Sequence, residues 1–398
     1  MTKRFLVLGS GSMGRAVALD LGRGADVEVV LMVDSDLRSA REGKSFARSD
    51  KVKSARLDVT DHDSVLDAME GRDVAVSCVP YQLNHALAKA AIEAGCSLVD
   101  LGGNSEVVQK ELALDRAARR AGVTIIPDCG LAPGLVSILS ADALGRFDSV
   151  DEVHLRVGGL PLHPRPPLDY MMVFSAAGLI NEYVEPAVVI RDGKVQTVES
   201  LEDVEEIGFP EPFGRLEAFN TSGGTSTLPQ TLLGKVKELD YKTIRYKGHC
   251  DRVRLLRDLG LFDASPIAVS GGKVAPRAVM EALLSQRLTY GEEDDVVLLR
   301  VQAVGSKGGR RRTLTYTIID HGDKAAGLTA MMRMTAFPAS IVAQMIASGE
   351  ISQKGALPQE LVVPTGRFLE QLGRRGIDLV IKWSQAAAGD RMSVGGVR

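Results

Sequence analysis

The stretch RFLVLGSGSMG, residues 4–14, decides the fold of the first part of the chain. The apolar run from Phe5 to Leu8 is typical of a strand that is buried on both faces of a parallel sheet. A glycine-rich turn and a helical segment follow. Gly9 allows a tight turn, Gly11 lets a ligand come close to the backbone, and Gly14 lets the helix pack closely on the strand. The pattern predicts a strand, a turn and a helix built to receive a phosphate group.

A second strand, Val27 to Val33, comes after this helix and ends at Asp34. A carboxylate at this place can accept hydrogen bonds from the ribose hydroxyls of a dinucleotide, and the N–H groups of Ser12 and Met13 can face its pyrophosphate. The combination predicts a dinucleotide-binding Rossmann domain. NAD is the favoured cofactor because Asp34 repels a 2′-phosphate, although Arg38 leaves NADP open.

Strand-like and helical segments alternate through the first third of the chain. Short apolar runs such as SLVDLG and VTIIPD alternate with amphipathic stretches such as NHALAKAAIEAG. This alternation predicts parallel strands joined by right-handed helical crossovers, which is a doubly wound α/β domain.

Ligands of such a domain bind beyond the carboxyl ends of the strands. Pro80 and Tyr81 follow the fourth predicted strand, and we expect Tyr81 to pack against the nucleotide. Asp100 follows the fifth strand and Asp128 the sixth. Each aspartate is either a functional carboxylate or an ordinary cap or turn residue, and the sequence leaves both interpretations open.

The pattern changes after about residue 134, where one helix is followed by segments of alternating polarity. Asp192-Gly193 and the link 307–309 stand where hairpin turns are expected. These segments predict an α+β domain with a mostly antiparallel or mixed sheet. Helical patterns return after about residue 330, and Pro338 is expected in the first turn of a helix.

The stretch RVGGLPLHPRPPLDY, residues 156–170, contains four prolines and a Gly-Gly pair. Proline fixes φ and has no N–H to donate. We therefore expect this stretch to be neither a helix nor a central strand, but a stiff and largely extended segment.

The richest polar cluster of the chain lies between residues 217 and 249. A Gly/Ser/Thr loop leads into a helix, and Arg245 on the next strand can hold a carboxylate through two parallel hydrogen bonds. The alternative is an ordinary helix cap beside a solvated basic strand. The polar residues are Glu217, Asn220, Thr221, Ser222, Thr225, Ser226, Lys242, Arg245 and His249.

Composition limits the class of protein. The length of 398 residues suits two domains, and 45% hydrophobic and 25% charged residues are typical of a globular protein. A net charge of −3 favours neither nucleic acid nor a membrane as partner, so we expect a small-molecule substrate. The four cysteines lack the spacing of a metal site or a disulfide framework, which indicates no metal and a reducing, cytoplasmic location.

Together the motifs resemble those of the saccharopine dehydrogenase-like family, and within it the NAD-dependent L-lysine 6-dehydrogenase branch. The resemblance implies a nucleotide-binding domain made of residues 1–133 and 331–398, with a substrate-binding and dimerisation domain, 134–330, inserted between them. It also implies a homodimer formed through the second domain. The motifs are, in chain order, GSGSMG, VDLGG, IIPDCGLAPG, VGGLPLHPRPPLDY, FSAAGLINEYVEPAVVIRDGK, LEAFNTSGGTSTL and TIRYKGH.

The activity implied is NAD-dependent oxidative deamination of the ε-amino group of L-lysine. The products are ammonia and the 6-semialdehyde, which cyclises to 1-piperideine-6-carboxylate. An ε-ammonium with a pKa of ~10.4 must lose a proton before its carbon can give up a hydride. The candidate bases are Asp128, His249 and Asp100, although a histidine after a strand is often a structural residue held by hydrogen bonds.

The resemblance also suggests how the substrate is bound. Arg245, with Thr243 on the same strand, would hold the α-carboxylate. Glu217 or Asp169 would pair with the α-ammonium. The proline-rich segment would line the substrate cleft, through residues that include Gly159 and Tyr170.

Two other functions fit the sequence. The first is a saccharopine reductase-like, NAD(P)H-dependent reduction of an imine that joins an amine and a carbonyl acid. Its larger substrate carries more carboxylates and would need further cations, such as Arg165 or Lys242. The second is a catalytically idle, NAD-binding regulator.

Overall fold

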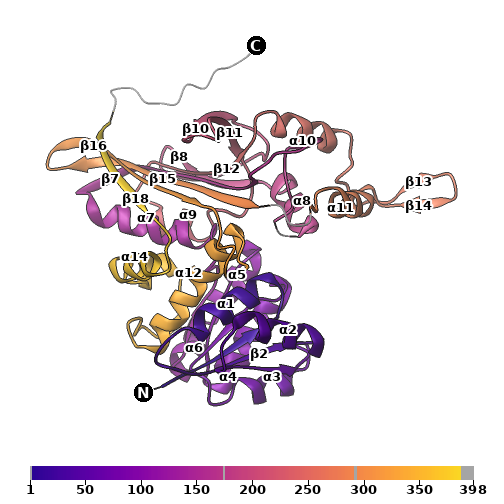
Figure 1. Cartoon of the computed structure of the whole chain (residues 1–398). Helices are drawn as coiled ribbons and strands as arrows, with labels where there is room; N and C mark the ends of the chain where they lie inside the picture. Colours follow the sequence, from indigo (N-terminus) through magenta and orange to yellow (C-terminus); the bar gives the residue numbers. More distant parts are fainter. Residues whose placement is uncertain (1, 174, 291–293, 387–398) are drawn as a thin grey trace, which may run out of the picture. The chain divides into compact units, whose positions relative to one another are not determined.

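The computed structural model describes residues 2–173, 175–290 and 294–386, and it divides into two compact units (Figure 1). Unit 1 is formed by the N-terminal segment up to Asp142, by Ser226–Leu228 and by Met332–Asp378. Unit 2 is formed by Ala143–Thr225, by Pro229–Met331 and by the segment that starts at Leu379.

Unit 1 is built on a seven-stranded sheet with the order β17-β6-β5-β4-β1-β2-β3, in which every paired strand runs parallel. The order reverses between β1 and β4, which is where doubly wound sheets bind nucleotides. The predicted doubly wound α/β fold is confirmed. The strands are β1 (Lys3–Leu8), β2 (Val27–Asp34), β3 (Val52–Arg56), β4 (Val74–Ser77), β5 (Ser97–Asp100), β6 (Thr124–Ile126) and β17 (Gly355–Ala356).

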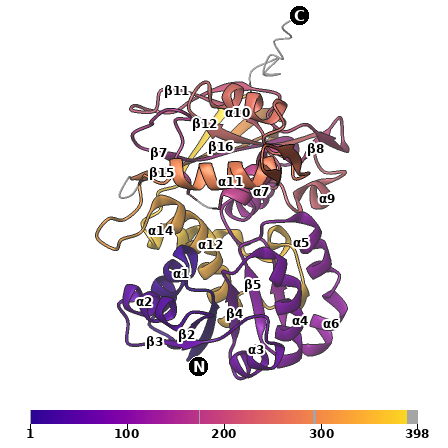
Figure 2. The ribbon, with the colours of Figure 1, turned by 90° about the vertical axis from the view of Figure 1, so that its right-hand side faces the viewer.

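Helices connect these strands and complete the core of unit 1. Leu87 and Ala91 of α4 pack with Leu8, Leu98 and Ile125 of the sheet. Helix α4 also contacts α3 and α6 (Figure 2). The helices are α1 (Ser12–Gly22), α2 (Leu37–Ala47), α3 (His62–Met69), the 3₁₀ turn η1 (Tyr81–Leu83), α4 (Asn84–Ala94), α5 (Ser105–Leu112), α6 (Asp115–Ala121), α13 (Gln359–Val362) and α14 (Thr365–Arg374). The division between the units falls within α7 (Leu135–Arg146), α9 (Leu228–Leu232) and α12 (Ala330–Ala347).

Unit 2 is built on a nine-stranded mixed sheet, as the sequence predicts. Its main path is β10-β11-β12-β7-β15-β16-β18, and β8 pairs with β12 and β9. Among the described strands of this sheet, β12 and β7 form the one parallel pair. The strands are β7 (Ser149–Pro161), β8 (Ala187–Arg191), β9 (Lys194–Val198), β10 (Glu205–Gly208), β11 (Arg215–Asn220), β12 (Glu238–Arg245), β15 (Asp295–Lys307), β16 (Arg310–Asp320) and β18 (Val380–Gln385). The remaining elements are α8 (Ala176–Val184), α10 (His249–Asp258), α11 (Pro276–Arg287) and the hairpin of β13 (Ile267–Val269) and β14 (Gly272–Val274).

Both predicted hairpins are confirmed. Asp192 and Gly193 join β8 to β9 with φ angles of 49° and 73°, as a type I′ turn requires. Gly308 and Gly309 join β15 to β16 with φ angles of 59° and 71°.

The expectation for residues 156–170 was partly wrong. Arg156 to Pro161 form the end of β7, a central strand that pairs with β12 on one side and β15 on the other. The strand can form because Pro161 is its last residue and the other prolines of this stretch follow it in the sequence. Gly158 suits it, because a Cβ at that position would lie 2.6 Å from the carbonyl oxygen of Ile244.

The last segment also differs from the expectation. Strand β18 pairs with β16, so part of 331–398 belongs to the mixed sheet of unit 2 instead of the nucleotide-binding unit. Pro338 lies inside α12 and not in its first turn, because the apolar residues before it are helical too. Within the described ranges, every helix is too short or too polar to cross a bilayer.

Candidate functional site

The glycine turn after β1 has the geometry that a dinucleotide needs. Gly9 has φ +95°, and a Cβ on it would lie 2.8 Å from the carbonyl oxygen of Cys78. A Cβ on Gly14 would lie 2.0 Å from the carbonyl oxygen of Gly9, so the helix can approach the turn only without a side chain. At Gly11 a Cβ would meet no atom within 4 Å, which leaves open space above the backbone.

The first turn of α1 can bind an anion. Its N-cap residue, Gly11, offers no side chain to the helix N–H groups. Ser12 and Met13 are the first helical residues, so their N–H groups lack partners within the helix. These free donors and the positive end of the helix dipole suit the pyrophosphate of a dinucleotide.

Asp34 ends β2 beside this turn. Its Oδ2 accepts hydrogen bonds from the N–H of Ser10 at 2.8 Å and from its hydroxyl at 2.7 Å, and its Oδ1 accepts one from the N–H of Asp36 at 3.0 Å. Burial alone would raise the pKa of Asp34, but these N–H groups hold it below its usual value. Asp34 is therefore a charged and fixed acceptor, as recognition of ribose hydroxyls requires.

Tyr81 lies at the carboxyl end of β4, as predicted. Pro80 precedes the 3₁₀ turn η1, which Tyr81 begins. The ring of Tyr81 packs on the backbone of Gly103, where a Cβ would lie 2.8 Å from ring atom Cδ1. This contact fixes the ring next to the loop that follows β5.

The fold brings Asp100 and Asp128 together, from the ends of neighbouring strands. The N–H groups of Gly102 and Asp128 donate to Oδ1 of Asp100, at 2.6 and 3.2 Å. Asp100 is fully buried and Asp128 is 3% exposed. The two aspartates predicted from the sequence thus form one buried pair at the carboxyl edge of the sheet.

Asp128 is held in a specific orientation. It has φ +61°, in the left-handed region, and its Oδ2 accepts a hydrogen bond from the hydroxyl of Ser226. The side-chain amide of Gln359 donates to its carbonyl oxygen at 2.5 Å. Burial, and then the charge of Asp100, raise the pKa of Asp128 to about 8. A carboxyl group with this pKa can gain or lose a proton near neutral pH.

Glu111 is a third buried carboxyl group, which we did not predict from the sequence. It lies on α5 and is fully buried. Burial, and then the charge of Asp100, raise its pKa. The spacing contained a clue, because Glu111 follows the buried Val108 by three residues and so shares the buried face of the helix.

In unit 2, Arg245 lies at the end of β12 and is 3% exposed. Its guanidinium stacks on the ring of Tyr170, 4.5 Å from the ring centroid. Nε donates to the hydroxyl of Tyr183 at 3.3 Å, and Nη1 donates to the carbonyl oxygen of Ile244 at 3.0 Å. Nη2 of Arg245 also forms an ion pair with Oε2 of Glu182, 3.9 Å away.

His249 lies in the same cluster, and both of its ring nitrogens are engaged. Nδ1 donates to the carbonyl oxygen of Leu168 at 2.8 Å, so Nε2 accepts from the hydroxyl of Tyr183 at 2.9 Å. Burial, and then the charge of Arg245, lower the pKa of His249 to about 3. These contacts favour the structural alternative for His249.

The other predicted substrate residues have structural contacts. Glu217 accepts hydrogen bonds from the N–H groups of Gly248 and Cys250, at 2.9 and 2.7 Å, and so caps the start of α10. Asp169 pairs with Arg252 at 2.6 Å. The hydroxyls of Thr243 and Thr221 lie 2.6 Å apart. Tyr170 is fully buried, and a Cβ on Gly159 would lie 2.5 Å from Cε of Met331.

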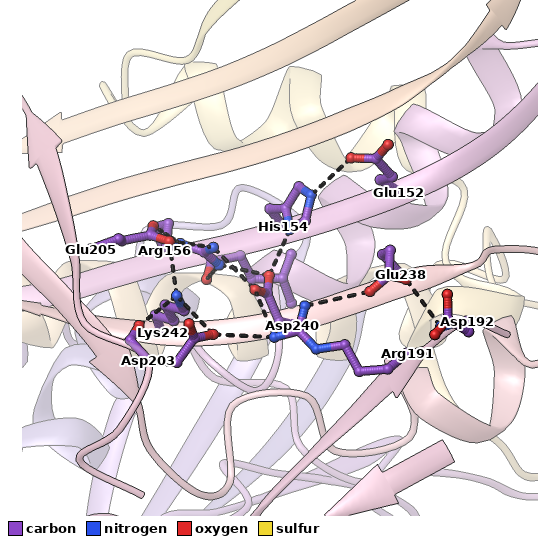
Figure 3. Close-up of polar contacts among 11 residues, drawn as sticks. Glu152, His154, Arg156, Arg191, Asp192, Asp203, Glu205, Glu238, Asp240 and Lys242 are labelled. Atoms are coloured by element: carbon purple, nitrogen blue, oxygen red, sulfur yellow. Dashed lines mark hydrogen bonds and ion pairs between the residues drawn. The ribbon is translucent and has the colours of Figure 1, made fainter. Parts of the chain in front are cut away.

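A buried ion network occupies one face of β7 and β12 (Figure 3). Arg156 donates to Asp240 at 2.8 Å and also to Glu205. Lys242 lies 2.9 Å from the same glutamate. Because side chains alternate along a strand, Lys242 projects from the face of β12 opposite to Arg245.

Comparisons with known proteins place this geometry in a family. The models for the saccharopine dehydrogenase NADP binding domain and the saccharopine dehydrogenase C-terminal domain match residues 5–126 and 130–377. Saccharopine dehydrogenase [NADP(+), L-glutamate-forming] of Saccharomyces cerevisiae is 26% identical over 433 residues, which cover 90% of this chain and 94% of the relative. Carboxynorspermidine synthase of Vibrio cholerae is 22% identical over 410 residues, with 94% of this chain and 95% of the relative covered.

Mitochondrial alpha-aminoadipic semialdehyde synthase of Rattus norvegicus is 24% identical over 445 residues, which cover 94% of this chain. The chain spans about half of that relative, 47% of its length. Among solved structures, apo saccharopine dehydrogenase (L-Glu forming) from Saccharomyces cerevisiae superposes with a TM-score of 0.79 at 22% identity, covering 96% of this chain and 100% of that one.

The doubly wound sheet, its glycine turn and the matched NADP binding domain define a protein with an NAD(P)-binding domain. More specifically, the chain belongs to the saccharopine dehydrogenase family.

Proposed function

We propose that this protein oxidises the ε-amino group of L-lysine with NAD, and releases ammonia and the 6-semialdehyde, which cyclises to 1-piperideine-6-carboxylate. The observation that carries this proposal is Asp128. It is a buried carboxyl group at the carboxyl edge of the Rossmann sheet, and its pKa is raised to about 8. Such a group suits the removal of a proton from an amine.

The chemistry sets the order of events. The ε-ammonium has no lone pair, so its proton must go to a base before the carbon can release a hydride. Asp128 in its ionised form accepts that proton. The hydride acceptor would be the nicotinamide of a bound NAD. Water then attacks the iminium carbon, the C–N bond breaks, and ammonia leaves.

Asp128 is the best base of the three predicted candidates. His249 has both ring nitrogens engaged and a pKa lowered to about 3, so it would not accept a proton near neutral pH. Asp100 already accepts two N–H groups on Oδ1, which fixes its role as an acceptor within the protein.

The cations of unit 2 support a substrate with one carboxylate. Lys242 is fully engaged with Asp203 and Glu205 in the ion network, on the strand face opposite to Arg245. Arg165 stacks on Tyr290, 5.1 Å from its ring centroid. Of the three cations considered from the sequence, Arg245 is the one we propose to hold the α-carboxylate.

The coenzyme that Asp34 favours is NAD. Its fixed carboxylate can accept two ribose hydroxyls and would repel a 2′-phosphate. Arg38 lies nearby but pairs with Glu42, at 3.0 Å.

A second candidate function is oxidation of saccharopine. Three relatives carry the name saccharopine dehydrogenase [NADP(+), L-glutamate-forming], at 23–26% identity. That substrate carries more carboxylates than lysine, and would need cations besides Arg245.

The test is a matrix of two substrates and two coenzymes. Purified protein is mixed with L-lysine or saccharopine and with NAD or NADP, and both nicotinamide absorbance and ammonia are measured. We expect the highest kcat/KM with lysine and NAD, with one ammonia released per NADH. If the coenzyme is reduced faster with saccharopine than with lysine and no ammonia is released, saccharopine oxidation would be the function instead of lysine oxidation. If neither coenzyme is reduced with either substrate, the result would favour the third interpretation, a catalytically idle, NAD-binding regulator.

A further inference from the structure

Glu111 is fully buried, yet no N–H or hydroxyl group of the described chain donates to either of its side-chain oxygens. Burying an ionised carboxylate without donors or a counter-ion is strongly unfavourable. A buried carboxyl group in this situation keeps its proton, because the neutral acid avoids most of that cost.

Asp100 is the partner of Glu111. Its Oδ1 accepts the N–H groups of Gly102 and Asp128, whereas its Oδ2 is buried and has no N–H or hydroxyl donor. The Glu111 carboxyl group interacts with that of Asp100 as a hydrogen-bond partner. Two carboxyl groups can form a hydrogen bond only when one of them carries a proton.

The groups around this pair make a second negative charge unfavourable. The charge of Asp128 contributes to the raised pKa of Glu111, after burial and Asp100. The charge of Glu360 contributes in the same direction to the pKa values of Asp128 and Cys129, after burial and Asp100. The half-buried thiol of Cys78 and the buried thiol of Cys129 lie near the same cluster, and burial and then the charge of Asp100 raise the pKa of both. Among the described residues, the groups with the largest effects on the pKa values of Asp100, Glu111 and Asp128 include no cation.

We propose that Glu111 is a protonated positioning residue, whose O–H donates to Oδ2 of Asp100 and keeps Asp100 ionised. The negative charge of Asp100 then makes Asp128 a proton acceptor for catalysis. This second step rests on the proposed function, whereas the protonation of Glu111 does not.

The direction of each effect agrees with this arrangement. The hydrogen bond from Glu111 lowers the pKa of Asp100, against the larger opposing effect of burial. Burial and the charge of Asp100 raise the pKa values of Asp128 and of Glu111. Removing the donor on Glu111 should therefore raise the pKa of Asp100, reduce its negative charge and lower the pKa of Asp128.

Infrared spectroscopy tests the protonation directly. At pH 9 we expect wild-type protein to show the carbonyl stretching band of a buried carboxylic acid, and Glu111→Gln to lose it. Glu106→Gln is the matched control, because Glu106 lies exposed on the same helix. It should lose only a carboxylate band. If Glu111→Gln also loses a carboxylate band and no acid band, Glu111 is ionised and the proposal is wrong.

A titration of the Asp128 acid band tests the positioning role without any enzyme assay. Asp128→Asn assigns that band. Glu111→Gln can still donate an N–H to Asp100, so the midpoint should stay within about half a pH unit of the wild-type value. Glu111→Leu removes the donor, and Asp100→Asn removes the charge even if the leucine variant does not fold. Both variants should lower the midpoint of the Asp128 titration by at least one pH unit. An unchanged midpoint in either variant would overturn the positioning role of Glu111. Because all readouts are spectroscopic, a failure to oxidise lysine leaves this test intact.

Discussion

Gly102 lies directly against the carboxyl group of Asp128, since a Cβ added to Gly102 would fall 1.8 Å from Oδ1 of Asp128. Any side chain at position 102 must therefore displace the proposed base. A shift of about 1 Å in a reacting group can cost ~100-fold in rate. We expect Gly102→Ala to lower kcat for lysine oxidation at least that much, with the KM for NAD little changed.

The control for this variant is Gly122→Ala. Gly122 has φ +72° and Gly102 has φ +77°, so alanine suffers similar backbone strain at both positions. A Cβ on Gly122 meets no atom within 4 Å. Comparable losses of turnover in the two variants would show that strain, and not the displaced carboxyl group, is responsible.

The raised pKa of Asp128 predicts a pH dependence. Only the ionised carboxylate accepts a proton, so kcat/KM for lysine should rise with pH and level off above about 8. Asp128→Asn should lower kcat by about 10²–10⁴-fold and abolish this ionisation. The measurement is a rate profile from pH 6.5 to 10, with the exposed Asp67→Asn as control. A wild-type profile without an ionisation between pH 7 and 9 would contradict the role of Asp128.

Arg245 should act on the substrate and not on the coenzyme. Arg245→Lys keeps the positive charge but loses the planar fork that binds a carboxylate with two hydrogen bonds. We expect the KM for lysine to rise about tenfold or more, and the KM for NAD to change less than twofold. Arg165→Lys, at an exposed position, should alter neither constant. Equal increases in both KM values for Arg245→Lys would remove it from its assigned role.

The ion network of unit 2 predicts a second, purely structural pH dependence (Figure 3). Nδ1 of His154 lies 2.7 Å from Asp240, and Nε2 lies 3.3 Å from Glu152. Burial alone would lower the pKa of His154, but these carboxylates, Asp240 above all, raise it to about 9. The protonated form thus stabilises the fold fully below the unfolded pKa of about 6.5, and this contribution is lost as the pH rises through 9.

His154→Gln tests that prediction. The free energy of unfolding, measured by chemical denaturation, should fall by on the order of 2–3 kcal/mol at pH 6 and by much less at pH 10. A loss that is the same at both pH values would show that His154 contributes through packing and not through its charge.

The Rossmann turn could be predicted in detail because its determinants are local. The strand before the turn and the helix after it determine where Gly9, Gly11 and Gly14 are needed. Asp100 and Asp128 could be predicted to lie near each other, because parallel strands end at the same edge of a sheet. Their buried state and their altered pKa values depend on neighbours that sequence spacing does not specify.

Contacts between distant segments could not be predicted. Ser226 was assigned from sequence to the loop of the second domain, yet it donates to Asp128, 98 residues away, and belongs to unit 1. Strand β18 pairs with β16, although α12, β17, α13 and α14 lie between these two strands in the sequence. No local sequence pattern indicates this pairing. Glu111 is fully buried, whereas a glutamate in an amphipathic helix is usually exposed.

The most direct test of the central claim follows the nitrogen that leaves. The protein is supplied with NAD and with L-lysine labelled with ¹⁵N at either the ε or the α position, and the released ammonia is analysed by mass spectrometry. Our account predicts labelled ammonia from the ε-labelled substrate alone, in equal amount to NADH. Label released from the α position, or NADH formed without ammonia, would contradict it.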